Sequence, residues 1–303
     1  MKRFQSPSFS LATTLACALP ILLSACAGSS SSSSTTSTVA PSAASFTSWS
    51  TYTPNTAIGF SGGSSSAMTA AGALSQSDSA GSATLTLQGD GIASVISATN
   101  GASTINLSSA NGDTLVSGFG GATTLGLDKA QTTMTVFANP TTSAYEYQTF
   151  GAWGNYGTGG AAGAISVGNV TPLAGLPTSG TGNFTGGASA YYVDATNAAY
   201  LVNSTLNVNV DFAGRTASFA TSNSAMTGGP RGTPLPNSNL DLSGNLSYGA
   251  GSTKLTGTVT STSGMTGPVN GKFYGPVANE IGGTYAVTGS GLGSMVGSFG
   301  GKR

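Results

Sequence analysis

The chain has no histidine in its 303 residues, and it has only two cysteines. Without histidine the protein lacks the most common general base and the most common metal ligand, and a Ser-His-Asp triad is impossible. Charged residues make up only 6% of the chain and the formal net charge is zero, so no basic patch for nucleic acid is expected. These absences favour a binding or structural protein over an enzyme, and we predict no nucleic-acid partner.

Glycine and hydroxyl-bearing residues are abundant, in contrast to charged residues. The chain has 46 glycines, and serine and threonine are plentiful, so its solubility depends on hydroxyl groups and exposed amides. It also lacks the long runs of Ala, Leu, Glu and Lys that are typical of helical proteins. This composition is typical of an extracellular protein built from strands and tight turns, and the predicted fold class is all-β.

The N-terminus has the features of a bacterial lipoprotein leader. A basic start precedes an apolar run, Leu11–Leu23, which is too short to span a membrane but suits a signal peptide. Leu23-Ser-Ala-Cys26 then has the pattern of a lipobox, in which the leader is cleaved before a lipidated cysteine. We therefore expect residues 1–25 to be a signal peptide and Cys26 to carry the lipid. Because Cys17 lies in the leader, no disulfide can form within one mature chain.

Residues 26–45 are nearly all small and polar, with an unbroken serine run at Ser29–Ser34. Such a segment cannot bury enough apolar surface to fold, so we expect a flexible tether. After it, residues 46–143 contain short alternating apolar runs separated by turn signals such as Asn111-Gly-Asp113. The clearest strand is Tyr200–Phe212, where most even positions are apolar and most odd positions are polar, so that one face is buried.

The most specific motif lies near the C-terminus, in Gly271-Lys-Phe-Tyr-Gly-Pro-Val-Ala-Asn-Glu-Ile-Gly-Gly283. Phe273 and Tyr274 lie on opposite faces of a strand, which Pro276 ends because proline has no N–H to donate. Glu280, after the turn, is placed to accept backbone N–H bonds and so to hold the strand connection. A last strand is expected in Gly297-Ser-Phe-Gly-Gly-Lys-Arg303.

These two segments resemble the signature that ends the β-barrel domain of transferrin-binding protein B and related surface lipoproteins of Gram-negative bacteria. The resemblance implies an N-terminal β handle-like domain, residues 46–143, followed by a C-terminal eight-stranded antiparallel β-barrel, residues 144–303. It implies a structural role for the motif positions, which are Gly271, Phe273, Tyr274, Gly275, Pro276, Glu280, Gly282, Gly283 and Phe299.

Two other segments are similar to the same family. Tyr145–Trp153 resembles the opening strand of the barrel, and Leu176–Gly186 resembles a later family segment, with Gly182 and Phe184 in place of the usual Ala and Tyr. We therefore expect the strand of Phe299 to close the barrel by pairing with a strand near Tyr145. Nine or ten strand-like runs occur over this region, against eight in the family, and Ala162–Val167 is the weakest of them.

The resemblance implies a lipid-anchored outer-membrane protein at the cell surface. It would bind a host protein or a haem-type ligand in iron or nutrient acquisition, beside a TonB-dependent receptor. The alternative is a structural or adhesive protein whose barrel only displays loops. Aromatic residues and arginine are favoured at interfaces, and the candidates for a contact surface are Trp49, Tyr52, Tyr156, Tyr191, Tyr192 and Arg231.

No cofactor is expected. Because histidine is absent and Cys26 would be lipidated, haem iron could find only Tyr, Met, Lys or carboxylate ligands, which disfavours haem relative to a protein ligand. The candidate ligands near the barrel strands are Met265, Met295, Tyr191 and Tyr274. A catalytic carboxylate pair would require the fold to bring together distant residues such as Glu146 and Glu280. The glycine-rich stretches lack the Lys-Ser/Thr ending of a phosphate loop.

Overall fold

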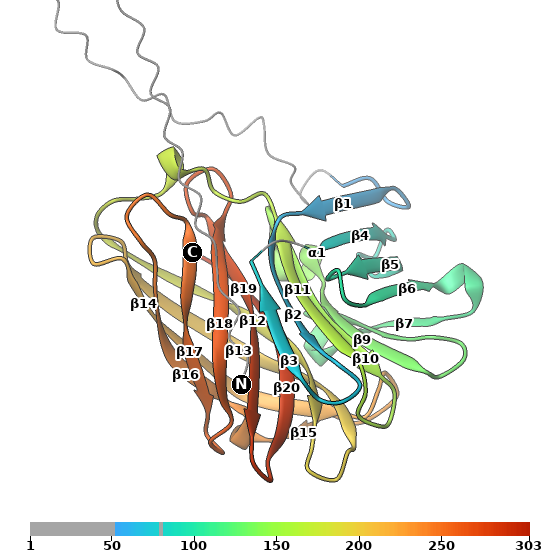
Figure 1. Cartoon of the computed structure of the whole chain (residues 1–303). Coiled ribbons are helices and arrows are strands. Elements are labelled where there is room, and N and C mark those ends of the chain that lie inside the picture. The colour runs from blue at the N-terminus through green and yellow to red at the C-terminus, as the bar shows by residue number, and fades with distance from the viewer. Residues whose placement is uncertain (1–51, 79–80) are drawn as a thin grey trace, which may run out of the picture. The chain divides into compact units, whose positions relative to one another are not determined.

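The computed structural model describes residues 52–78 and 81–303, so the leader, Cys26, the tether and Trp49 lie outside the described residues. The described residues form three antiparallel sheets joined by turns and a few short helical segments (Figure 1). The predicted all-β class with an eight-stranded barrel is confirmed. In this part of the chain, none of the helices has the length and apolarity needed to cross a membrane.

The C-terminal sheet is the closed barrel. Its eight strands are β12 (Thr181–Val193), β13 (Ala199–Asp211), β14 (Thr216–Thr227), β16 (Leu242–Ser247), β17 (Lys254–Ser261), β18 (Thr266–Tyr274), β19 (Glu280–Gly289) and β20 (Gly293–Lys302). Each strand pairs with the next one in this order, and the last, β20, pairs with the first, β12. A two-residue strand, β15 (Leu235–Pro236), also pairs with β14, at Ala225 and Met226.

The barrel interior is a packed core. In β13 the even-numbered residues Leu206, Val208 and Val210 face inward and are almost fully buried, which confirms the predicted alternation. They meet aromatic side chains from the other strands, so the lumen is filled with side chains.

Two sheets precede the barrel. The seven-stranded sheet has the spatial order β3 (Leu74–Ser77), β2 (Gly63–Met68), β11 (Ala162–Gly168), β10 (Gln148–Asn155), β9 (Thr133–Ala138), β8 (Thr123–Leu127) and β7 (Thr114–Gly118). The four-stranded sheet has the order β1 (Ala57–Ser61), β4 (Ser82–Leu87), β5 (Ala93–Thr99) and β6 (Thr104–Ser108). The helical segments are η3 (Ser109–Asn111), η4 (Phe119–Gly121), α1 (Pro140–Ser143), η5 (Leu173–Gly175) and η6 (Ser238–Leu240).

The seven-stranded sheet lies between the four-stranded sheet and the outer wall of the barrel (Figure 1). Strand β10 is central in it and is buried on both faces. Trp153 packs in the cluster shared with the four-stranded sheet. Ala152 packs in the cluster shared with the barrel wall, which contributes Ala286 and Val296. The described residues belong to one compact unit.

The predicted opening of the barrel near Tyr145 is wrong. Strand β10 pairs with β9 and β11 in the seven-stranded sheet, whereas β20, which carries Phe299, pairs with β12 and β19. Tyr145 contacts β20 through its side chain, since its hydroxyl donates to the carbonyl oxygen of Gly300 at 2.6 Å. A strand that is buried on both faces has the same pattern in either sheet, so its sequence does not reveal its partners. Ala162–Val167 is a strand, but it also lies in the seven-stranded sheet.

Candidate functional site

The C-terminal motif lies at the contact between the barrel and the seven-stranded sheet. Its two adjacent aromatic residues point to opposite faces of the barrel wall. Phe273 points into the barrel, where its ring lies 5.8 Å from that of Phe212. Tyr274 points outward and is fully buried under the sheet. Its hydroxyl lies 3.0 Å from both the Oγ and the carbonyl oxygen of Ser166 in β11. The motif therefore joins the two parts of the molecule.

Glu280 forms a second link at the start of β19. Its Oε1 accepts the backbone N–H of Glu146 at 2.5 Å, and both carboxylate oxygens lie 3.3 Å from the backbone nitrogen of Tyr147. Burial raises the pKa of Glu280 to about 7, although the backbone N–H bonds oppose this shift. Glu280 and Glu146 are therefore neighbours, but the buried carboxylate of Glu280 binds backbone groups, whereas Glu146 is exposed.

The motif glycines allow close approach on both sides of the barrel wall. A Cβ on Gly282 would lie 2.0 Å from Oε1 of Gln148 in the seven-stranded sheet. Inside the barrel, a Cβ on Gly283 would lie 2.7 Å from the ring of Phe299. Gly275 has a φ of 83°, in the left-handed region that favours glycine, and it begins the turn that continues through Pro276.

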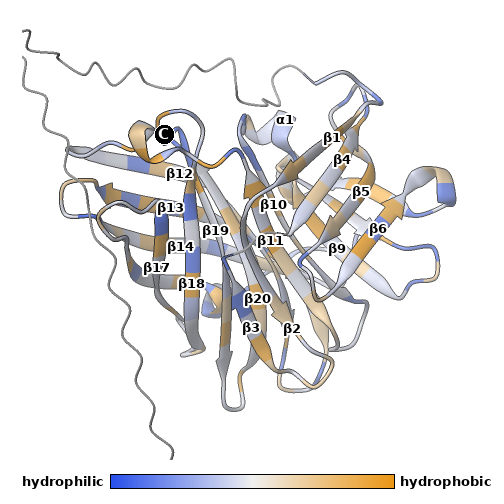
Figure 2. Cartoon of the chain, turned by 45° about the horizontal axis from the view of Figure 1, so that its top comes forward, coloured by the Kyte–Doolittle hydropathy of each residue, from blue (hydrophilic) through white to orange (hydrophobic). Residues whose placement is uncertain are grey.

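The end of the barrel beside the C-terminus carries an exposed apolar pair. The guanidinium of Arg303 lies 5.6 Å from the centre of the Phe184 ring and also donates to the carbonyl oxygen of Val277. Leu173 is 53% exposed and Val277 is 42% exposed. Their turns are adjacent, because the Thr171 hydroxyl donates to the carbonyl oxygen of Gly275 at 2.7 Å. We call Leu173 and Val277 the apolar rim. The ribbon beside the C-terminus includes stretches coloured as hydrophobic in Figure 2.

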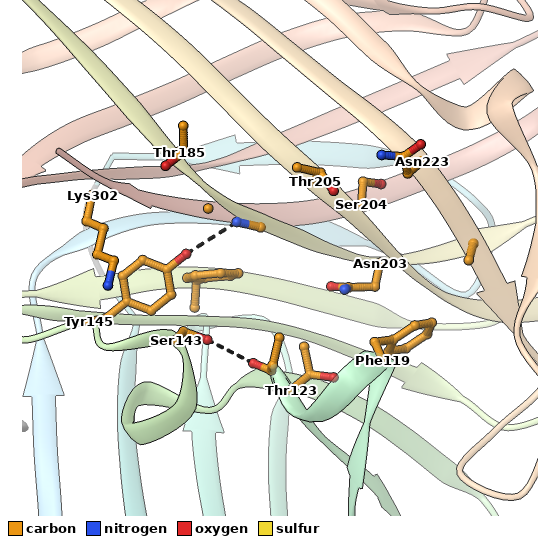
Figure 3. A pocket seen from close by; sticks show the side chains of 15 residues that line it. Phe119, Thr123, Ser143, Tyr145, Thr185, Asn203, Ser204, Thr205, Asn223 and Lys302 are labelled. Carbon is orange, nitrogen blue, oxygen red and sulfur yellow. Dashed lines mark hydrogen bonds between the residues drawn. The ribbon is translucent and has the colours of Figure 1, made fainter.

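A cavity of about 610 Å³ lies between the barrel wall and the seven-stranded sheet. Its lining includes Phe119, Tyr145, Thr185, Asn203, Asn223 and Lys302 (Figure 3). We call it the seam cavity. No sequence pattern predicts this cavity, because its walls come from segments far apart in the chain and no local pattern relates them.

One comparison identifies the barrel. Residues 176–303 match the family model described as the C-lobe and N-lobe beta barrels of Tf-binding protein B. The barrel is therefore similar to the barrels of transferrin-binding protein B. The predicted family resemblance is confirmed for these residues, which contain the whole motif. Among curated protein sequences, none matches the chain.

Solved structures of transferrin-binding protein B resemble the chain at low identity. The protein from Haemophilus parasuis is 16% identical with a TM-score of 0.46, over 80% of this chain and 45% of that chain. Isotype 1 from serogroup B Neisseria meningitidis is 14% identical with a TM-score of 0.43, over 80% of this chain and 43% of that chain. A surface lipoprotein is 11% identical with a TM-score of 0.42, over 79% of this chain and 98% of its own. The chain thus spans less than half of the Haemophilus parasuis and Neisseria meningitidis proteins.

The predicted contact residues around this barrel divide into buried and exposed ones. Tyr191 and Tyr192 are buried, and the Tyr191 hydroxyl donates to the carbonyl oxygen of Asn155 at 3.0 Å, so the prediction that they form a contact surface is wrong. Both fall on a strand covered by other elements, a position that their residue type does not reveal. Tyr52 and Tyr156 are half-buried, and Arg231 is exposed.

The four candidate haem ligands lie on opposite sides of the barrel wall. Met265 and Met295 point into the barrel core, whereas Tyr191 and Tyr274 point outward beneath the seven-stranded sheet. All four are almost fully buried. Within residues 52–78 and 81–303, no three His, Cys, Asp or Glu side chains gather as a metal site would require.

Proposed function

We propose that this protein is a lipid-anchored outer-membrane protein that binds a host protein at the cell surface in iron acquisition. The match of the barrel to the transferrin-binding protein B family supports a binding role over an enzymatic one. The name of that family makes transferrin the first partner to test. Cys26 would provide the anchor, and metabolic labelling with a fatty acid, compared between the wild type and Cys26→Ser, tests it.

The apolar rim is the surface that supports partner binding. Among the described residues only three large apolar side chains are strongly exposed, and two of them, Leu173 and Val277, are on adjacent turns. Beside them a hollow of about 260 Å³ is lined by Leu173, Phe212 and Tyr248 among others. Adjacent exposed apolar residues beside a hollow are typical of a protein-binding site. The two sheets before the barrel would act as the handle that supports this end.

Binding of transferrin to the purified protein, measured by surface plasmon resonance, tests the proposal. Transferrins from several mammals, with and without iron, should be compared. Leu173→Asp and Val277→Asp should each weaken binding about tenfold or more, because each places a charge in an apolar contact. Leu235→Asp is the matched control, since Leu235 is equally exposed, at 55%, but lies on β15.

The possible outcomes separate the alternatives. Equal loss in all three variants, or binding that none of them affects, would contradict the apolar rim as the site. If no transferrin binds, a titration with hemin tests the haem-type ligand, for which we expect no tight stoichiometric complex, since the candidate ligands are buried on two sides of the wall. If neither ligand binds, a structural or adhesive role becomes the better proposal, and attachment of cells that display the protein should then depend on it.

A further inference from the structure

The seam cavity has the size and position of a small-molecule site. Its volume of about 610 Å³ lies within the usual range for such pockets, which often form where two parts of a protein meet. One wall is the outer face of β12, β13 and β14, and the opposite wall comes from η4, β8 and the segment that leads into β10 (Figure 3).

The barrel wall of the cavity offers hydroxyl and amide groups that other side chains leave free. Thr185, Thr205 and Asn223 are exposed, and within residues 52–78 and 81–303 no protein group forms a hydrogen bond with their side chains. The side-chain oxygen of Asn203 accepts from Ser189, which leaves its amide N–H groups as donors. Gly187 has no side chain, so the floor between these groups stays open. Such a set of donors and acceptors matches the hydroxyl groups of a sugar.

Two residues that line this cavity have a backbone φ in the left-handed region. Asn223 has a φ of 56° at a bulge, where Ser204 of β13 faces both Asn223 and Ser224 of β14. Phe119, on the opposite wall, has a φ of 45°, which is unusual for a bulky side chain. Strained residues of this kind concentrate at functional sites. Phe119 is half-buried and gives this end of the cavity an aromatic side chain, onto which the apolar face of a sugar can pack.

The cavity has one charge, at the end opposite to Phe119 (Figure 3). Lys302 is half-buried, and within the part of the chain that the structure describes it forms no ion pair. Its neighbour across the strand pair, Glu280, directs its carboxylate to the backbone of Glu146 and Tyr147. An unpaired ammonium beside hydroxyl and amide groups favours a ligand that carries one carboxylate and several hydroxyls.

We propose that the seam cavity binds an acidic sugar, with its carboxylate at Lys302, its hydroxyl groups at Thr185, Asn203 and Asn223, and its apolar face toward Phe119. The ligand could be a free sugar acid or the terminal acidic residue of a glycan on a host glycoprotein. Both share this chemistry, and the test below distinguishes them. This site is separate from the apolar rim, and its occupancy does not depend on a protein partner.

Calorimetric titration of the full chain in detergent, supported by saturation-transfer NMR, tests the proposal. The probes are N-acetylneuraminic acid, glucuronic acid, sialyllactose and, as a neutral control, glucose. We expect the acidic probes to bind and glucose to bind at least about tenfold more weakly, as for loss of a charge-assisted hydrogen bond. Tighter binding of sialyllactose than of N-acetylneuraminic acid would assign the site to glycans, and the reverse would assign it to free sugar acids.

Two variants with matched controls make the test specific. Lys302→Gln should remove the preference for acidic over neutral sugars, whereas Lys129→Gln, at an exposed lysine in the turn before β9, should not. Asn223→Gly should weaken binding while the protein stays folded, because glycine adopts a left-handed φ without strain. Asn55→Gly is its control, since Asn55 also has a left-handed φ of 62° but lies outside the cavity. Absence of acidic-sugar binding, equal binding of glucose, or binding that neither Lys302→Gln nor Asn223→Gly changes would overturn the proposal.

Discussion

At the scale of single residues, Glu280 is the most unusual group in the described structure. It is a carboxylic acid that is only 2% exposed, and it binds the backbone of the segment that enters the seven-stranded sheet. Burial of the charged form costs free energy, while the N–H bonds from Glu146 and Tyr147 favour it. Burial has the larger effect, so the folded protein holds this proton more tightly than the unfolded chain does.

The stability of the protein should therefore depend on pH through Glu280. Because the folded-state pKa, about 7, is above the unfolded value of 4.5, this group stabilises the fold most below about pH 4.5 and the contribution is lost as the pH rises to about 7. The loss should be up to about 3 kcal/mol in the free energy of unfolding. Glu280→Gln keeps an acceptor oxygen and should flatten this dependence in urea unfolding measured across the window.

The control for this prediction is Glu146→Gln, because Glu146 is exposed. It should unfold with nearly the same pH dependence as the wild type. If the free energy of unfolding of Glu280→Gln depends on pH as strongly as that of the wild type, another titratable group causes the dependence.

Gly300 provides a second prediction at the residue scale. It lies on the outer face of β20, where a Cβ would lie 2.3 Å from the ring of Phe150. Gly300→Ala should reduce the free energy of unfolding by about 1 to 3 kcal/mol through overpacking. Gly249→Ala is the matched control, because nothing lies within 4 Å of a Cβ there. If contact with Phe150 causes this loss, Gly300→Ala should reduce the free energy of unfolding by less in a Phe150→Ala background. Denaturant unfolding of the double variant measures this difference.

At the scale of elements, the position of β10 and the pairing of β20 decide the architecture. Strand β10 contributes Trp153 to one cluster and Ala152 to the other, so it connects the outer sheet to the barrel. Strand β20 closes the ring by pairing with β12, and it also forms the wall on which the seven-stranded sheet packs. Closure removes the exposed sheet edges that would otherwise invite association between chains.

A disulfide can test this closure. Thr185 and Lys302 are direct partners across β12 and β20, so Thr185→Cys with Lys302→Cys, in a chain without Cys17 and Cys26, should form a disulfide on mild oxidation. Thr185→Cys with Lys272→Cys is the control, since β18 lies three strands away and the two sulfurs would be too far apart. Thiol titration and mass spectrometry measure the outcome. Efficient bonding in the control pair, or none in the test pair, would contradict the observed strand order.

At the scale of the whole described molecule, the barrel and the sheets before it share a buried contact. Apolar side chains of β9, β10 and β11 pack with Tyr191, Leu201, Ala286 and Val296 of the barrel wall. The hydroxyl of Tyr274 adds a hydrogen bond to Ser166 across this contact. Neither part can lose its neighbour without exposing this surface to water.

The two parts should therefore unfold together. In a Trp49→Phe background the fluorescence of Trp153 reports on the seven-stranded sheet, and near-UV circular dichroism includes the buried tyrosines of the barrel. We expect the two denaturant transitions to coincide, as in a two-state unit. Tyr274→Ala should lower the free energy of unfolding by about 3 to 5 kcal/mol, because it leaves a cavity in the contact. Both midpoints should therefore shift together. An earlier transition of Trp153 alone would show that the sheets unfold independently of the barrel.

The sequence by itself determined the fold class, the alternation of buried and exposed residues in strands such as β13, and the family of the barrel. The last two follow from local information, since a strand with one solvent-exposed face repeats every two residues and the C-terminal motif is contiguous. Only the tertiary structure decided which sheet contains β10, because a strand buried on both faces shows no alternation. It also decided that Tyr191 and Tyr192 are buried, that Glu280 binds the backbone of Glu146, and that residues distant in the chain enclose the seam cavity. Those features depend on contacts between segments that are distant in the chain. Glu280 and Glu146, for example, are more than a hundred residues apart, and no local pattern encodes such a contact.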